Sequence, residues 1–115
     1  MDYRYIFKSA EEIPKASGKL TNKLPDWLRG TILSVTPGKW DFPEFTVNHY
    51  FDGLALLMRF GIGDETVTVQ TKYLESDAYK KAIMAGKPVL PEYGTPSSKD
   101  PTKNIVSRIT SIVSF

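Results

Sequence analysis

One short stretch of the chain concentrates side chains that could do chemistry. It reads Asn48-His49-Tyr50-Phe51-Asp52-Gly53, and it holds the only histidine, a carboxylate and two aromatic rings directly before the apolar run 54–60. A histidine three residues before an aspartate could act as a general base that the carboxylate orients, with Asn48 in support. Alternatively, His49 lies where a loop leads into a buried strand, with its ring nitrogens bonded to backbone groups. The residues favour this second interpretation.

Other residues with potential chemistry are scattered. A stable transition-metal site needs three or four ligands, and this chain has one histidine and no cysteine. The nearest acidic residues, Asp41, Glu44 and Asp52, do not form a cluster in the sequence. Gly61 and Gly63 precede an alternating segment and not a helix, so they predict a hairpin turn and not a phosphate-binding loop. We therefore expect this chain alone to bind no metal.

The elements that must position this stretch are predicted to be mainly strands. Residues 31–36 form an extended run that Pro37-Gly38 is expected to close. The continuous apolar run 54–60 is typical of a strand buried on both faces, and a glycine-rich turn follows at 61–65. Residues 66–73 alternate between two faces, which indicates a half-buried strand paired with 54–60 in a hairpin. The face expected to be buried carries Val67, Val69, Thr71 and Tyr73.

Two helical segments are predicted, near 76–86 and at 103–115. Ser76 can cap the first, which stops at Gly86, and the proline-rich residues 88–101 form a loop over the surface. The second has an apolar stripe at helical spacing, with Lys103 and Arg108 nearby. Such a stripe suits a membrane interface or packing against another part of the protein. We expect its membrane-facing residues to be Ile105, Val106, Ile109, Ile112, Val113 and Phe115.

Length and composition limit the function further. With 115 residues the chain is at most one domain, and its net charge of +2 is far from that of a nucleic-acid binder. Residues 1–24 show no periodicity and are expected to form an N-terminal arm. The first residues have neither the apolar core nor the small-residue cleavage site of a secretory signal, and no apolar run reaches about 20 residues, the length of a membrane span. We expect a cytoplasmic protein that could attach peripherally to a membrane.

Several motifs also resemble those of one known family, in its order and at its spacing. The chain between about residue 20 and residue 115 is similar to the carotenoid cleavage oxygenases, above all to the animal branch with the β-carotene dioxygenases and the retinal pigment epithelium isomerohydrolase. The motifs are Pro25-Asp26-Trp27-Leu28-Arg29-Gly30-Thr31, Pro37-Gly38-Lys39-Trp40, the run from Asn48 to Phe60, Lys72-Tyr73-Leu74-Glu75-Ser76-Asp77-Ala78-Tyr79-Lys80 and Glu92-Tyr93-Gly94-Thr95. Within the third motif, the identifying residues are Asn48, His49, Phe51, Asp52 and Gly53.

The resemblance implies a fold and a reaction. The fold is a seven-bladed β-propeller, of which this chain resembles the N-terminal part, with an arm at 1–24 and an incomplete propeller domain at 25–115. The family's Fe(II) is held by four histidines expected downstream of Phe115, and His49 is not one of them. The complete enzyme cleaves a double bond of a carotenoid or retinoid with O2, and the family's membrane-facing patch corresponds to about 96–115.

This chain alone is expected to be inactive. The alternative is a catalytically silent β-rich module that associates with a membrane or with a full-length relative.

Overall fold

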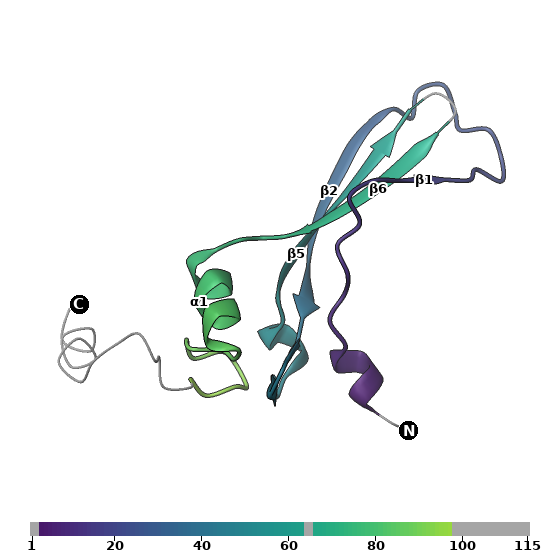
Figure 1. Cartoon of the computed structure of the whole chain (residues 1–115). Helices are drawn as coiled ribbons and strands as arrows, with labels where there is room; N and C mark the ends of the chain where they lie inside the picture. The colour runs from purple at the N-terminus through teal and green to yellow at the C-terminus, as the bar shows by residue number, and fades with distance from the viewer. Residues whose placement is uncertain (1–2, 64–65, 98–115) are drawn as a thin grey trace.

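The computed structural model describes residues 3–63 and 66–97. Within them, a four-stranded antiparallel sheet has the strand order β1-β6-β5-β2, and a two-stranded ribbon pairs β3 with β4 (Figure 1). The mainly β fold is therefore confirmed. The elements in chain order are η1 Tyr3–Phe7, β1 Ala16–Gly18, β2 Gly30–Lys39, β3 Asp41–Phe42, β4 Phe45–Thr46, η2 Tyr50–Asp52, β5 Leu54–Ile62, β6 Val67–Tyr73 and α1 Asp77–Ala85.

The predicted hairpin is confirmed, and β5 and β6 pair along their length. At the turn, the Gly63 amide donates to the Thr66 carbonyl at 2.9 Å. On β6, Thr71 and Tyr73 are buried whereas Gln70 and Lys72 are exposed, as the alternation predicts.

The expectation that β5 is buried on both faces is wrong. Only Leu56 on this strand is buried, and Leu57, which points to the opposite face, is 37% exposed. An antiparallel sheet can leave one face in water, so a continuous apolar run does not require cover on both sides.

The expectation that Pro37-Gly38 closes its strand is also wrong. β2 continues through this pair to Lys39, with a register shift between Pro37 and Lys39. Among residues 3–63 and 66–97, β2 is an edge strand whose sheet partner is β5. Proline lacks an N–H donor but is tolerated on an edge or at a bulge, which explains why the strand does not stop.

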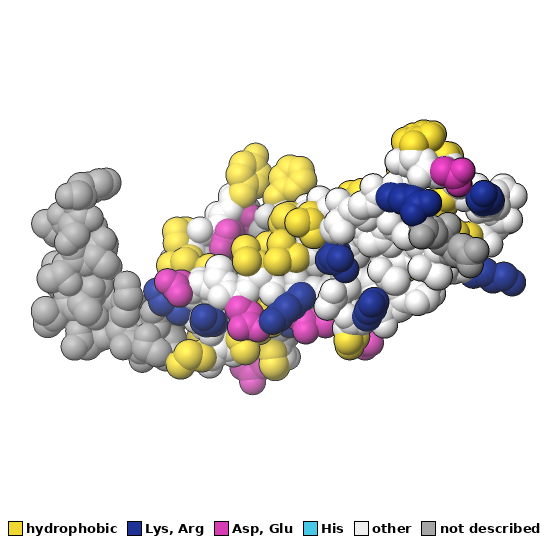
Figure 2. Space-filling view, turned by 90° about the horizontal axis from the view of Figure 1, so that it is seen from above, with side chains coloured by type: hydrophobic (Ala, Val, Ile, Leu, Met, Phe, Trp, Pro, Cys, Tyr) yellow, Lys and Arg dark blue, Asp and Glu magenta, His cyan; other side chains and the backbone are white. Residues whose placement is uncertain are grey.

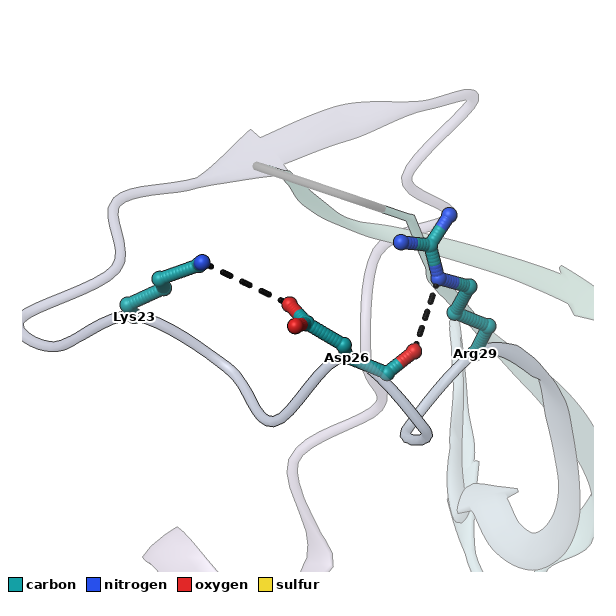
Figure 3. A network of polar contacts seen from close by, with 3 residues as sticks. All are labelled: Lys23, Asp26 and Arg29. Atoms are coloured by element: carbon teal, nitrogen blue, oxygen red, sulfur yellow. Dashed lines mark hydrogen bonds and ion pairs between the residues drawn. The ribbon is translucent and has the colours of Figure 1, made fainter.

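A turn at residues 25–28 precedes β2. The Leu28 amide donates to the Pro25 carbonyl at 2.9 Å. Figure 3 shows the polar contacts around it: Lys23 Nζ lies 3.4 Å from Asp26 Oδ1, and Arg29 Nε donates to the Asp26 carbonyl at 3.0 Å. Both charged side chains of the Lys23–Asp26 pair are more than four-fifths exposed, so the pair contributes little stability.

The N-terminal segment is attached to the sheet over residues 9–18, which we call the N-terminal strap. Ala16–Gly18 pair with β6 as an edge strand, an element too short and too small in its side chains to give a sequence signal. The Ser9 amide and hydroxyl both donate to the Asp41 carboxylate, and these bonds hold the pKa of Asp41 below its usual range. The boundary between an arm at 1–24 and a domain at 25–115 stays a prediction.

The helix predicted near 76–86 is confirmed as α1. The Ser76 side chain accepts a hydrogen bond from the Tyr79 amide, and Gly86 ends the helix in the left-handed conformation, with φ of 66°. Residues 87–97 have no helix or strand, as the proline-rich sequence predicts. The predicted helix 103–115, with Ile105, Val106, Ile109, Ile112, Val113 and Phe115, lies outside the described residues.

A small hydrophobic core lies where the ribbon, η1 and α1 meet. Its buried members are Trp40, Phe42, Val47 and Ala82, with Phe7, Phe45 and Leu54 packed against them. Trp40 also supports the stretch that holds the histidine, since its Nε1 donates to the Tyr50 carbonyl at 2.8 Å and its ring stacks on Tyr50. The core therefore fixes the position of residues 48–53.

Candidate functional site

Residues 48–53 form the loop that leads into β5. His49 is the N-cap of η2, where its Nδ1 accepts a hydrogen bond from the Phe51 amide at 3.2 Å. The His49 carbonyl accepts from the Asp52 amide at 3.0 Å. The bond at Nδ1 satisfies an amide at the helix start that has no partner within the helix. This position agrees with the interpretation of His49 as a residue that shapes the start of a strand.

Asp52 is the buried anchor of the site, with 2% of its surface exposed. Its two carboxylate oxygens accept from the Gly94 amide at 3.1 and 3.0 Å, and Oδ2 also accepts from the Thr95 hydroxyl at 2.6 Å. In the described part of the chain, the hydrogen bonds of this carboxylate go to those two residues and not to His49. The geometry therefore does not assemble a histidine base oriented by Asp52.

Two further hydrogen bonds join the loop 92–95 to residues 48–53. The Asn48 amide donates to Thr95 Oγ1 at 2.8 Å, and the Asn48 side chain donates to the Gly94 carbonyl at 3.3 Å. A Cβ on Gly94 would lie 2.6 Å from the Cβ of His49, so only glycine allows this approach. Thr95, which is 1% exposed, is a site residue that reasoning from the sequence missed. The motif Glu92-Tyr93-Gly94-Thr95 marks this loop in the sequence, but the motif does not show which distant residues Thr95 contacts.

Glu92 lies close enough to Asp52 for the two carboxylates to affect one another. Burial raises the pKa of Glu92 above its usual value, and the charge of Asp52 raises it further. The Glu92 amide donates to the Thr95 carbonyl at 2.9 Å, which closes the loop on itself. The loop 92–95 therefore brings a second carboxyl group near that of Asp52.

Aromatic rings cover the outer side of the site, and we call this set the aromatic ridge: His49, Tyr50, Phe51 and Tyr93. The His49 ring centroid is 5.3 Å from that of Phe51 and 4.9 Å from that of Tyr93. Phe51 is 72% exposed and Tyr93 84% exposed. These rings pack against one another and are also exposed to solvent, so they offer flat apolar faces to a ligand.

The described residues do not fit a metal ion. No three of their His, Cys, Asp or Glu side chains lie close enough together to hold one. The donor set around His49 consists of one imidazole and a carboxylate whose hydrogen bonds are already made, which is short of the ligands an iron site needs. No helix in residues 3–63 and 66–97 is long and apolar enough to cross a membrane.

A cavity of about 530 Å³ lies elsewhere in the structure. It is between the β3–β4 turn and the C-terminal end of α1, and its lining residues are Pro43 to Phe45 and Ile83 to Lys87. None of the residues of the aromatic ridge, nor Asp52, lines it.

Comparison with known proteins gives concordant results. The family model described as "Retinal pigment epithelial membrane protein" matches residues 6–115. Human β,β-carotene 15,15'-dioxygenase is 42% identical over 114 residues, which are 99% of this chain and 21% of that protein. The mitochondrial carotenoid-cleaving dioxygenase of Macaca fascicularis is 38% identical over 107 residues, 92% of this chain and 19% of the relative. The chain thus spans about a fifth of the length of these curated relatives.

Solved structures show the same fold. A variant of the apocarotenoid oxygenase of Synechocystis matches with a TM-score of 0.69 and 22% sequence identity, over 84% of this chain and 21% of that chain. At that identity the likeness concerns the fold alone.

Proposed function

The chain belongs to the carotenoid oxygenase family, and from this premise we propose that it forms part of an oxygenase that cleaves a polyene double bond of a carotenoid or retinoid with O2. Its fold is that of a part of a β-propeller, as the sequence resemblance implied. The observation that carries the proposal is the match of nearly the whole chain to relatives named as carotenoid dioxygenases.

Within such an enzyme, we assign the aromatic ridge the role of contacting the substrate. A polyene is flat, long and apolar, and the exposed rings of Phe51 and Tyr93 present surfaces of matching chemistry. The hydrogen bonds of Asp52 to the 92–95 loop hold the two rings in place before a ligand arrives. A site that is already ordered loses less conformational entropy on binding.

Iron, when bound in the complete enzyme, would supply the activation of O2. The residues described here do not form its ligand set, so we assign them no role in binding iron. We propose that the four ligand histidines belong to the part of the enzyme that this chain does not cover. This chain then contributes scaffold and substrate contact, and by itself is inactive.

A chimera tests the proposal. The matched segment of human β,β-carotene 15,15'-dioxygenase is replaced by this chain, and the chimera is expressed in bacteria that accumulate a carotenoid. We expect carbonyl cleavage products by liquid chromatography. Phe51→Ala should reduce product formation about tenfold or more through lost substrate contact, whereas Lys23→Ala, on an exposed turn outside the ridge, should leave it unchanged.

A second candidate is a catalytically silent module that associates with a full-length relative. The exposed apolar side chains of β2 favour it, since they offer a surface for another protein. The chimera discriminates between the two: a folded chimera without cleavage supports the silent module. Location in the cytoplasm and membrane attachment through residues 105–115 remain part of the proposal.

A further inference from the structure

The second ring nitrogen of His49 makes no hydrogen bond within the described part of the chain. Nδ1 accepts from the Phe51 amide at 3.2 Å. A neutral imidazole has one acceptor and one donor nitrogen, so this bond places the proton on Nε2. Among residues 3–63 and 66–97, no buried side-chain nitrogen or oxygen lacks a partner, so Nε2, which has none, is open to solvent. His49 thus presents a free N–H donor.

This donor lies among apolar rings. The imidazole and the Tyr93 ring have an edge-to-face arrangement with their centroids 4.9 Å apart, and the Phe51 ring is tilted by 59° at 5.3 Å. Tyr93 is 84% exposed, whereas His49 is only partly exposed. Water therefore competes less for the imidazole N–H than for the Tyr93 hydroxyl. A ligand that packs on the rings meets a hydrogen-bond donor beside them.

The charges near this donor favour an uncharged ligand. A Cβ on Gly94 would lie 3.3 Å from the Cγ of His49 and 3.4 Å from Oδ2 of Asp52, so the carboxylate is close to the imidazole. Glu92 adds a second carboxyl group near Asp52. The aromatic ridge contains no lysine or arginine, and Figure 2 shows hydrophobic side chains gathered on one part of the surface it displays and Lys and Arg side chains on another. A ligand carboxylate would be repelled here, whereas a neutral oxygen would not.

We propose that the Nε2–H group of His49 donates a hydrogen bond to an uncharged oxygen atom of the substrate. The chain therefore favours a polyene that carries an ester, carbonyl or hydroxyl group over a polyene that is a pure hydrocarbon. This inference rests on the proposed function, since the aromatic ridge is its substrate surface, and it narrows the substrate class. One net hydrogen bond corresponds to a preference of about fivefold in Kd.

Matched ligands test this preference with the 115-residue chain. Methyl retinoate has ester oxygens that accept a hydrogen bond and cannot donate one, and its hydrocarbon analogue carries a methyl group in place of the ester. Quenching of tryptophan fluorescence by the polyene follows binding and requires no cleavage. We expect methyl retinoate to bind about fivefold more tightly than the hydrocarbon. It should also bind more tightly than retinoate, whose carboxylate is repelled.

Substitutions at His49 identify the donor. His49→Asn keeps an oxygen that can accept from the Phe51 amide, because asparagine is a good N-cap, but it removes the distal N–H. The ratio of the two Kd values should then fall to about one. His49→Gln extends an amide N–H farther from the backbone and should restore part of the preference. Tyr93→Phe keeps the ring and should keep the preference, and Lys23→Ala, on the exposed turn, should leave both Kd values unchanged.

Several outcomes would overturn the inference. Equal binding of ester and hydrocarbon by the unchanged chain does so, as does a preference that His49→Asn retains or that Tyr93→Phe alone abolishes. If neither ligand binds to the chain or to the chimera with the human dioxygenase, the substrate role of the aromatic ridge fails as well. An ester preference that depends on His49, in a chimera that does not cleave carotenoids, supports this inference and contradicts the proposed function.

Discussion

Asp52 joins two parts of the chain that are more than 40 residues apart. It does so as a buried carboxylate that accepts hydrogen bonds from one backbone amide and one hydroxyl, and these neutral donors replace the water it loses. His49, which first attracts notice in the sequence, makes a local contact with the Phe51 amide. The order of the aromatic ridge therefore depends on the carboxylate more than on the imidazole.

Replacing Asp52 should measure this dependence. Asp52→Ala leaves the Gly94 amide and the Thr95 hydroxyl without their acceptor, and we expect the free energy of unfolding to fall by about 1–3 kcal/mol. Asp52→Asn keeps one oxygen acceptor and should lose less. Urea denaturation of the full chain gives the values.

The control is Asp26→Ala, since the side chain of Asp26 is 82% exposed and its ion pair with Lys23 is on the surface. That substitution should change stability by less than about 0.5 kcal/mol. Equal losses for the two alanine variants would show that the contacts of Asp52 do not hold the loop.

At the scale of elements, the N-terminal strap and β6 are joined by Tyr73. Its hydroxyl lies 2.6 Å from the Ala10 carbonyl and 2.9 Å from the Gly38 carbonyl and shares its one proton between these two acceptors, and its amide donates to the Glu12 carboxylate at 2.7 Å. Burial raises the pKa of Tyr73 to about 12, with smaller contributions from Tyr79, Asp41 and Glu12. The folded protein therefore retains the phenolic proton at a pH where an unfolded chain releases it.

This retention predicts a loss of stability at alkaline pH. The folded pKa is higher than the unfolded value near 10, so the contribution of Tyr73 is complete below about pH 10 and is lost as the pH rises through about 12. Tyr73→Phe removes both the hydroxyl bonds and the titration. We expect the variant to be about 1–2 kcal/mol less stable at pH 9, and the difference to shrink at pH 11.5. Urea denaturation at the two pH values measures it, and a constant difference would contradict the assignment.

Local signals in the sequence predict some elements well and others poorly. The alternation of residues 66–73 and the cap at Ser76 are properties of one segment, and both predictions are confirmed. β1 escaped detection because three small residues pair with β6 only through their backbone. The path of β2 through Pro37 depends on its place at a sheet edge, which the sequence does not state. The contact of Asp52 with Thr95 was not predicted for the same reason, since it depends on how distant segments fold together.

At the scale of the whole molecule, much apolar surface is left uncovered. In the part of the chain that the structure describes, the buried hydrophobic residues are few: Trp40, Phe42, Val47, Leu56, Tyr73, Ala82 and Val89. In contrast, Trp27 and Leu33 are each more than 70% exposed. A protein that leaves large apolar side chains in water gains stability when a partner covers them, and it risks aggregation until one does.

Iron content distinguishes the metal binding of this chain alone from that of the complete enzyme. The ligand set that the family resemblance implies has four histidines, and the chain has one histidine and no cysteine. We expect the purified 115-residue chain, after incubation with Fe(II) and desalting, to retain far less than about one ion per molecule. The chimera with the human dioxygenase should retain about one, because we propose that its remaining sequence supplies the ligands. Elemental analysis of both samples gives the numbers.

A chain that retains iron at the level of the chimera would contradict this assignment of the ligands. His49→Ala in the chain then identifies the source: loss of the ion would place the metal at the aromatic ridge, and Nδ1 of His49 would have to release the Phe51 amide. With the expected result, His49→Ala in the chimera leaves the iron content unchanged, although it removes the N-cap of η2 and one ring of the aromatic ridge. The imidazole then supports η2 and the aromatic ridge without binding the metal, which belongs to the rest of the enzyme.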